Sequence, residues 1–177
     1  MEGRSAITIN ASPDEVYARF RQLERLPEFM YHVASVQVTG EGRSHWVAKG
    51  PAGTTVEWDA EIVEEVPGQR IAWRSVPDSS VESSGSVEFR PAPAEQGTEV
   101  RVVLDYQPPG GALGLGLGKV VAALFGEEPN QQLADDLRRL KQLIETGEIA
   151  RSEGSPAGTR TMNQADQSDA HPQEVQT

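Results

Sequence analysis

The chain has 177 residues, enough for one domain with its own hydrophobic core. It contains no cysteine, which excludes disulfides, thiolate catalysis and cysteine-ligated metals. Lys and Arg number 16 against 27 Asp and Glu, for a net charge of −11. Such an acidic chain repels phosphate backbones and anionic membrane surfaces, so nucleic-acid binding is not expected.

The N-terminal segment MEGRSAITINAS has neither the apolar core nor the cleavage site of a secretion signal. No apolar run reaches the ~18 residues that a membrane-spanning helix needs. We therefore expect a soluble, cytoplasmic protein.

A short strand is predicted over residues 4–10, followed by a helix with a strong start signal. Ser12 is the expected N-cap, Pro13 occupies the first helical position, and Glu15 completes a capping box. Pro27 is expected to end this helix. Its apolar stripe consists of Val16, Phe20 and Leu23.

Between residues 33 and 107 the apolar residues alternate with polar ones, as in half-buried strands. Glycine-, proline- and serine-rich turns separate six such segments, which predicts an antiparallel meander and a sheet of about seven strands. The segments are 33–38, 44–49, 55–66, 70–76, 84–90 and 98–106.

A helix is predicted after residue 129, with one apolar stripe, charges opposite it, and Gly147 as its C-cap. The stripe consists of Leu133, Leu137, Leu140 and Ile144. Residues 1–149 are expected to form the domain and the polar residues 150–177 a disordered tail. The predicted fold is α+β, a curved antiparallel sheet around a long C-terminal helix, with a ligand cavity between them.

Residues 11–38, ASPDEVYARFRQLERLPEFMYHVASVQV, resemble the opening of the START-like superfamily, and more narrowly the polyketide cyclase/dehydrase and lipid transport family, which includes coenzyme-Q-binding members. The segments WVAKGPAG, VEWDAEIVEEVPGQRIAWRS and SGSVEFRPAP are similar to a bacterial cyclase/dehydrase subgroup. The resemblance covers about residues 4–147. It implies a helix-grip fold with a deep cavity, without identifying a ligand or a shared catalytic motif.

Phosphate and metal sites are not predicted. With Gly118 and Lys119 as the end of a phosphate-binding loop, position 113 should be glycine but is Leu113, and Val120 lacks the required hydroxyl. The three histidines are far apart in the sequence. His45 and Glu57 could face each other on neighbouring strands, but two ligands do not make a metal site. The sequence predicts neither a cofactor nor a metal.

No catalytic residue can be assigned from the pattern. Glu57, Asp59 and Glu61 alternate with apolar residues and are expected to face water. Glu64 and Glu65 are adjacent, so one of them is expected to point the other way. Arg74 is expected to point outward.

Aromatic residues are the main candidates for the cavity wall because large rings offer flat apolar surfaces. The tryptophans occupy three successive strands at alternating positions, and two further aromatics follow on the last two strands. The candidates are Trp46, Trp58, Trp73, Phe89 and Tyr106 in the wall, with Phe29, Met30 and Tyr31 at the rim.

The stretch GGALGLGLGKVVAALFGEEP, residues 110–129, is expected to begin the helix that the sheet grips. Glycines inside a helix cost about 1 kcal/mol each relative to alanine, so this part is expected to act as a soft gate. Its leucines would meet either the ligand or, transiently, a membrane surface. The candidate ligand-binding stripe consists of Leu113, Leu117, Val121 and Leu124.

Two functions remain open, besides an interaction protein with a vestigial cavity. One is the binding of a small hydrophobic molecule such as a lipid, a quinone or a polyketide-like ring compound. The alternative is a polyketide cyclase, aromatase or dehydratase, for which Tyr106, Arg74 or Glu64 would converge inside the cavity. The sequence carries no signal for an oligomeric state.

Overall fold

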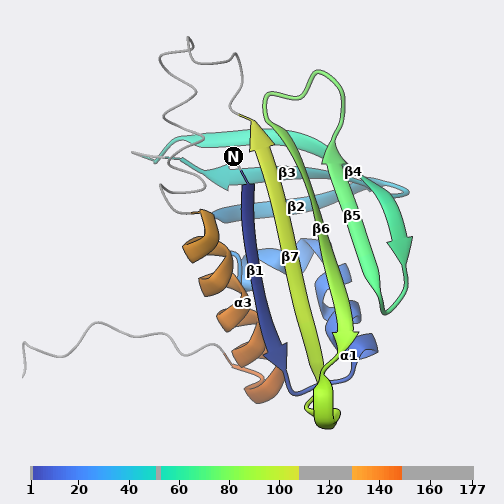
Figure 1. Cartoon of the computed structure of the whole chain (residues 1–177). Coiled ribbons are helices and arrows are strands. Elements are labelled where there is room, and N and C mark those ends of the chain that lie inside the picture. Colours follow the sequence, from blue (N-terminus) through green and yellow to red (C-terminus); the bar gives the residue numbers. More distant parts are fainter. Residues whose placement is uncertain (1, 51–52, 108–128, 149–177) are drawn as a thin grey trace, which may run out of the picture.

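The computed structural model describes residues 2–50, 53–107 and 129–148 (Figure 1). A seven-stranded antiparallel sheet, in the order β1-β7-β6-β5-β4-β3-β2, carries three helical segments. The strands are β1 (Glu2–Ile9), β2 (Val33–Gly40), β3 (Arg43–Lys49), β4 (Thr55–Val66), β5 (Arg70–Ser75), β6 (Glu82–Pro91) and β7 (Thr98–Gln107). The helical segments that accompany the sheet are α1 (Pro13–Arg21), the 3-10 helix η1 (Leu23–Glu28) and α3 (Pro129–Thr146), and a one-turn 3-10 helix, η3 (Pro93–Glu95), joins β6 to β7.

The sheet is a meander from β2 to β7 that is completed by the first strand. β1 pairs with β7 over its whole length, from Glu2 opposite Asp105 to Ile9 opposite Thr98. The predicted α+β fold and antiparallel meander are therefore confirmed.

The sheet curves strongly, and the helices lie on its concave side. In Figure 1, β2 and β3 run across the direction of β1 and β7, α3 lies alongside β1, and α1 lies behind the sheet. The main hydrophobic cluster joins these elements: Val16 of α1, Leu26 of η1, Ile71 of β5 and Leu140 of α3 are all nearly inaccessible to solvent. None of the described helices is both long and apolar enough to cross a membrane.

The start of α1 agrees with the prediction, but its end does not. Ser12 accepts a hydrogen bond from the backbone of Glu15, whose side chain accepts one from the backbone of Ser12. The α-helix ends at Arg21, and Pro27 lies inside η1 instead of ending α1. The tighter helix suits this segment because Leu23 and Leu26, three residues apart, both face the core.

Helix α3 also follows the prediction. Leu133, Leu137 and Leu140 are buried and Ile144 packs against the same core. Gly147 follows the helix with a φ of +76°, and its N–H donates to the carbonyl of Leu143. This is the left-handed helix end for which glycine is favoured.

A bulge in β4 changes which residues of that strand face the helices. Ile62 pairs with Trp73 and Glu64 pairs with Ala72, so Val63 is the extra residue. Beyond the bulge, Glu65 turns toward α1, where its Oε1 accepts hydrogen bonds from the Tyr17 hydroxyl and from Arg21. Adjacent Glu64 instead contacts Arg70 on the opposite face, which confirms the prediction that the two carboxylates diverge.

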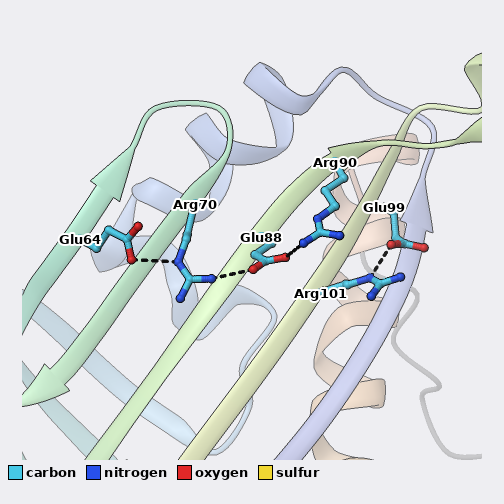
Figure 2. A network of polar contacts seen from close by, with 6 residues as sticks. All are labelled: Glu64, Arg70, Glu88, Arg90, Glu99 and Arg101. Carbon is cyan, nitrogen blue, oxygen red and sulfur yellow. Dashed lines mark hydrogen bonds and ion pairs between the residues drawn. The ribbon is translucent and has the colours of Figure 1, made fainter.

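The outer face of the sheet carries charged side chains across four strands (Figure 2). Arg70 bridges Glu64 of β4, at 3.0 Å, and Glu88 of β6, at 2.6 Å. Arg90 joins Glu88 at 2.5 Å, and Arg101 joins Glu99 on β7. Exposed pairs of this kind contribute little stability individually. They keep the convex face hydrated. The concave face, by contrast, is the one that packs against apolar groups.

We expect the replacement Ser12→Ala to lower the free energy of unfolding by about 1 kcal/mol, because it removes the side-chain oxygen that caps α1. Ser12→Gly is the matched control and should cost only a few tenths of a kcal/mol. Urea unfolding followed by circular dichroism measures both. Equal losses in the two variants would contradict the capping role.

We expect Gly85→Ala to displace the indole of Trp73. The two residues pair directly across β5 and β6, and a Cβ at position 85 would lie 2.6 Å from Cζ2 of Trp73. The strain should cost about 1–3 kcal/mol and shift the tryptophan fluorescence. Gly40→Ala, where a Cβ would meet nothing within 4 Å, is the control. An unchanged emission spectrum in Gly85→Ala would refute the proposed contact.

Candidate functional site

A cavity lies between the concave face of the sheet, η1 and α3. The space open to the centres of water-sized molecules is about 90 Å³, several times the roughly 10–15 Å³ that one such molecule needs. Most of its described lining is apolar. The lining includes Phe20, Leu23, Leu26, Phe29, Met30, Val33, Trp46, Trp58, Ala60, Ile62, Ile71, Trp73, Val102, Leu104, Leu133 and Leu137.

Three tryptophans on successive strands form the sheet's aromatic contribution to this wall. Trp46 and Trp58 face each other across β3 and β4, and their rings are stacked at 5.8 Å with an angle of 18° between planes. The indole N–H of Trp46 donates to the hydroxyl of buried Ser44, at 2.9 Å. Trp73 follows on β5. Gly85, its partner on β6, leaves room for the ring. Stacked rings and a satisfied indole hold a flat apolar surface in place.

The predicted site residues divide into four groups. Phe29, Met30, Trp46, Trp58 and Trp73 lie in the cavity lining. Tyr31 is 43% exposed and is stacked against the guanidinium of Arg139 at 4.0 Å. The predicted stripe and gate of the glycine-rich stretch, Leu113, Leu117, Val121 and Leu124, lie outside the described residues.

Phe89 and Tyr106 do not belong to the described lining, which corrects their assignment to the wall. Phe89 packs edge-on against Tyr17 and Phe20 under α1, with ring centroids 5.8 and 6.0 Å apart. Tyr106 is 1% exposed and belongs to a second buried cluster, with Trp58 and Val81. Both face inward as the alternation predicted, but other side chains cover them.

One end of the cavity is polar. His32, at the entrance to β2, and Asp136, in the middle of α3, both contribute to the lining. Nδ1 of His32 lies 3.4 Å from Oδ2 of Asp136. The other carboxylate oxygen, Oδ1, accepts a hydrogen bond of 2.7 Å from Arg139. Arg139 also donates to the backbone carbonyl of Phe29.

Burial shifts the pKa values of both groups toward their uncharged forms. It lowers the pKa of His32 to about 4, and the positive charges of Arg139 and Lys49 act in the same direction. It raises the pKa of Asp136 to about 7, although Arg139 opposes this shift. Near neutral pH the imidazole is therefore uncharged, and the contact between His32 and Asp136 is not an ion pair.

Asp136 is absent from the residues predicted for the site, because the sequence pattern places the charges of α3 opposite the leucine stripe. The helical spacing contained the signal. Asp136 follows Leu133 by three residues and precedes Leu140 by four, which puts it at the edge of the buried face. Asp136 as a whole is 4% exposed. The side chain of neighbouring Asp135 is 41% exposed and pairs with Arg138.

Most acidic residues of β4 form surface contacts, but Glu61, whose side chain is 21% exposed, also contributes to the cavity lining. Arg74 donates to Glu61 at 2.9 Å, and Glu64 contacts Arg70. Arg74 points outward as expected, and the convergence of Arg74 and Glu64 inside the cavity, which the enzyme alternative requires, does not occur. His45 contacts both Glu57 and Asp59 on the outer face. Among the described residues no group of three or more His, Asp or Glu side chains could hold a metal ion.

Comparison with known proteins agrees with this architecture. A curated relative, an uncharacterized 17.2 kDa protein of Streptomyces lincolnensis, is 30% identical over 142 residues, which is 79% of this chain and 87% of the relative. The structure of DR_A0006 from Deinococcus radiodurans is 42% identical, with a TM-score of 0.68, and the match covers 84% of this chain and 99% of that one.

A more distant likeness connects the fold to enzymes. The ZhuI aromatase/cyclase from Streptomyces sp. R1128 has a TM-score of 0.62 at 15% identity, covering 85% of this chain and 99% of that one. At this identity the likeness shows the fold alone. The family described as polyketide cyclase/dehydrase and lipid transport matches residues 9–138. The chain belongs to this polyketide cyclase/dehydrase and lipid transport family.

Proposed function

We propose that this protein binds a small hydrophobic molecule with a flat ring system in the cavity between the sheet and α3. The observation that carries the proposal is the apolar lining, with three tryptophans on successive strands. A ligand ring that replaces water against such a wall gains about 25 cal/mol for each Å² of apolar surface it buries. The cavity also offers a few polar groups at one end, as small-molecule sites usually do.

Two parts of the proposal concern residues outside the described ranges. The leucines of the glycine-rich stretch, Leu113 and Leu117, would meet the ligand as it enters. The proposed end of the domain, near residue 149, is the second. A chain without cysteine is compatible with the reducing cytoplasm, which is where we place its function.

The proposal predicts saturable quenching of the three tryptophans by menadione, an uncharged quinone. All three indoles belong to the wall, so a bound ring contacts at least one of them. Fluorescence titration measures the effect, and the linear quenching of free N-acetyltryptophanamide is the reference.

A matched pair of variants separates the cavity from general effects on the core. Ala60→Leu fills the cavity and should weaken menadione binding about tenfold. Ala48→Leu inserts the same side chain at a buried position of neighbouring β3 that is not in the lining. Thermal unfolding establishes that each variant is folded. Quenching that never saturates, or that both variants weaken equally, would overturn the proposal.

A second candidate function is a cyclase or dehydratase acting on a polyketide-like substrate. The specific observation in its favour is Asp136, a carboxyl group in the cavity wall whose pKa of about 7 suits proton transfer near neutral pH. In such a reaction a base removes a proton from a carbon between two carbonyls. The resulting carbanion adds to another carbonyl of the same chain, and the alkoxide that forms takes up the proton. Removal of a second proton from the same carbon, with protonation of the hydroxyl, then releases water and leaves a C=C bond. Asp136 would move the protons, with His32 as its positioning neighbour.

This second candidate predicts loss of water from a linear poly-β-keto thioester, followed by mass spectrometry. Asp136→Asn should lower the rate at least about 100-fold, the usual range for general acid–base groups. Asp135→Asn removes the same charge from a half-exposed position on the same helix and should retain activity. An equal rate in Asp136→Asn and wild type would exclude this mechanism.

A further inference from the structure

We propose that the cavity selects uncharged ligands carrying a hydroxyl group, which would reach Asp136 and His32, and that it excludes ligands ending in a carboxylate. The inference rests on the proposed function of ligand binding and names the chemical class of ligand. A phenol or another ring alcohol would fit, whereas a fatty-acid anion would not.

Asp136 is the group that makes the polar end selective. Its side chain is 6% exposed, and Oδ1 is held by Arg139. Oδ2 accepts no hydrogen bond from any residue in the described part of the chain. A buried polar atom without a hydrogen-bond partner destabilises the protein, because it has lost its hydrogen bonds to water. A ligand hydroxyl placed beside Oδ2 would remove that cost, which no purely apolar ligand can do.

A carboxylate ligand would need a positive charge that the described lining does not offer. No Lys or Arg lines the cavity among residues 2–50, 53–107 and 129–148. Arg139 is already engaged by Asp136, by the carbonyl of Phe29 and by the ring of Tyr31. Lys49 donates to the backbone carbonyl of Tyr31. In the described part of the lining, an entering anion would therefore face the carboxyl of Asp136 without a free cation.

The proton state of the two groups strengthens this selectivity. Burial keeps His32 neutral, and Arg139 and Lys49 add to that effect. Below its pKa of about 7, Asp136 is a carboxylic acid and can donate a proton in a hydrogen bond; above that pKa it is a carboxylate and can only accept. Nearby Asp135 disfavours the charged form, and Arg139 favours it. A hydroxyl both donates and accepts, so it pairs with either form, whereas an anion pairs only with the acid.

The test compares three ring compounds of similar shape: naphthalene, 2-naphthol and 2-naphthoate. Equilibrium dialysis measures their binding at pH values about one unit below and one unit above 7. We expect 2-naphthol to bind roughly 2- to 10-fold more tightly than naphthalene, with 2-naphthoate the weakest. The affinity for 2-naphthoate should fall further as the pH rises through 7, while that for 2-naphthol should stay nearly constant.

Two variants connect the selectivity to one carboxyl group. Asp136→Asn removes the buried negative charge and releases Arg139, so it should raise the affinity for 2-naphthoate about tenfold. Asp135→Asn removes an equal charge one residue away, at a side chain paired with Arg138, and should leave the order of affinities unchanged. The comparison in the wild-type protein needs no variant, so it still decides the matter if Asp136→Asn does not fold.

The possible results separate this inference from the function on which it rests. If naphthalene, 2-naphthol and 2-naphthoate bind equally well, or if 2-naphthoate binds best, the selectivity is overturned while ligand binding stands. The same holds if Asp136→Asn folds and keeps the wild-type order. If none of the three binds, the proposed function falls, and the selectivity with it.

Discussion

The leucine stripe of α3 packs against the concave face of the sheet, and the site depends on this contact. Leu133, Leu137 and Leu140 are buried against strands that curve across one another. A straight helix cannot fill the whole hollow of such a sheet, because its surface touches the strands along one line only. The remaining space is bordered by η1 on one side and by the tryptophans on the other.

The same contact produces the polar end of the cavity. The helical repeat that buries the leucines also brings Asp136 to the edge of the buried face, next to His32 from the start of β2. Removal of these two groups from water shifts both pKa values toward the neutral forms. Arg139, one turn of helix further on, donates a hydrogen bond to the carboxyl and partly offsets the cost of burying its charge. One packing contact thus determines both the shape of the site and its chemistry.

The inner and outer faces of the sheet differ because successive side chains of a strand point to opposite sides. This alternation puts Glu57 and Asp59 of β4 and the network around Arg70 in water, and it turns the three tryptophans inward. The same local rule predicted the strands, the capping box at Ser12 and the leucine stripe of α3. The chain's resemblance to its family added the helix-grip arrangement.

Contacts between distant segments are beyond the reach of these local rules. Phe89 and Tyr106 point inward as predicted, but α1 covers one and a second cluster encloses the other, so neither lines the cavity. Glu64 and Arg74 were weighed as catalytic groups, yet both lie on the outer face. The sequence pattern places Asp136 among the charges opposite the stripe. Which residues of a helix are buried becomes known only when the elements that pack against the helix are in place.

Periodicity, capping signals and turn residues act over only a few residues. The sequence alone therefore determines the helices and strands, their order, and which side chains of each strand face inward. Packing between segments about 100 residues apart in the chain determines which residues line the cavity and pairs His32 with Asp136. Burial of a charged group is a property of that packing, because it depends on how much water the neighbouring elements exclude. Assembly of the whole domain therefore turns an aspartate in an acidic helix into the polar centre of a hydrophobic site.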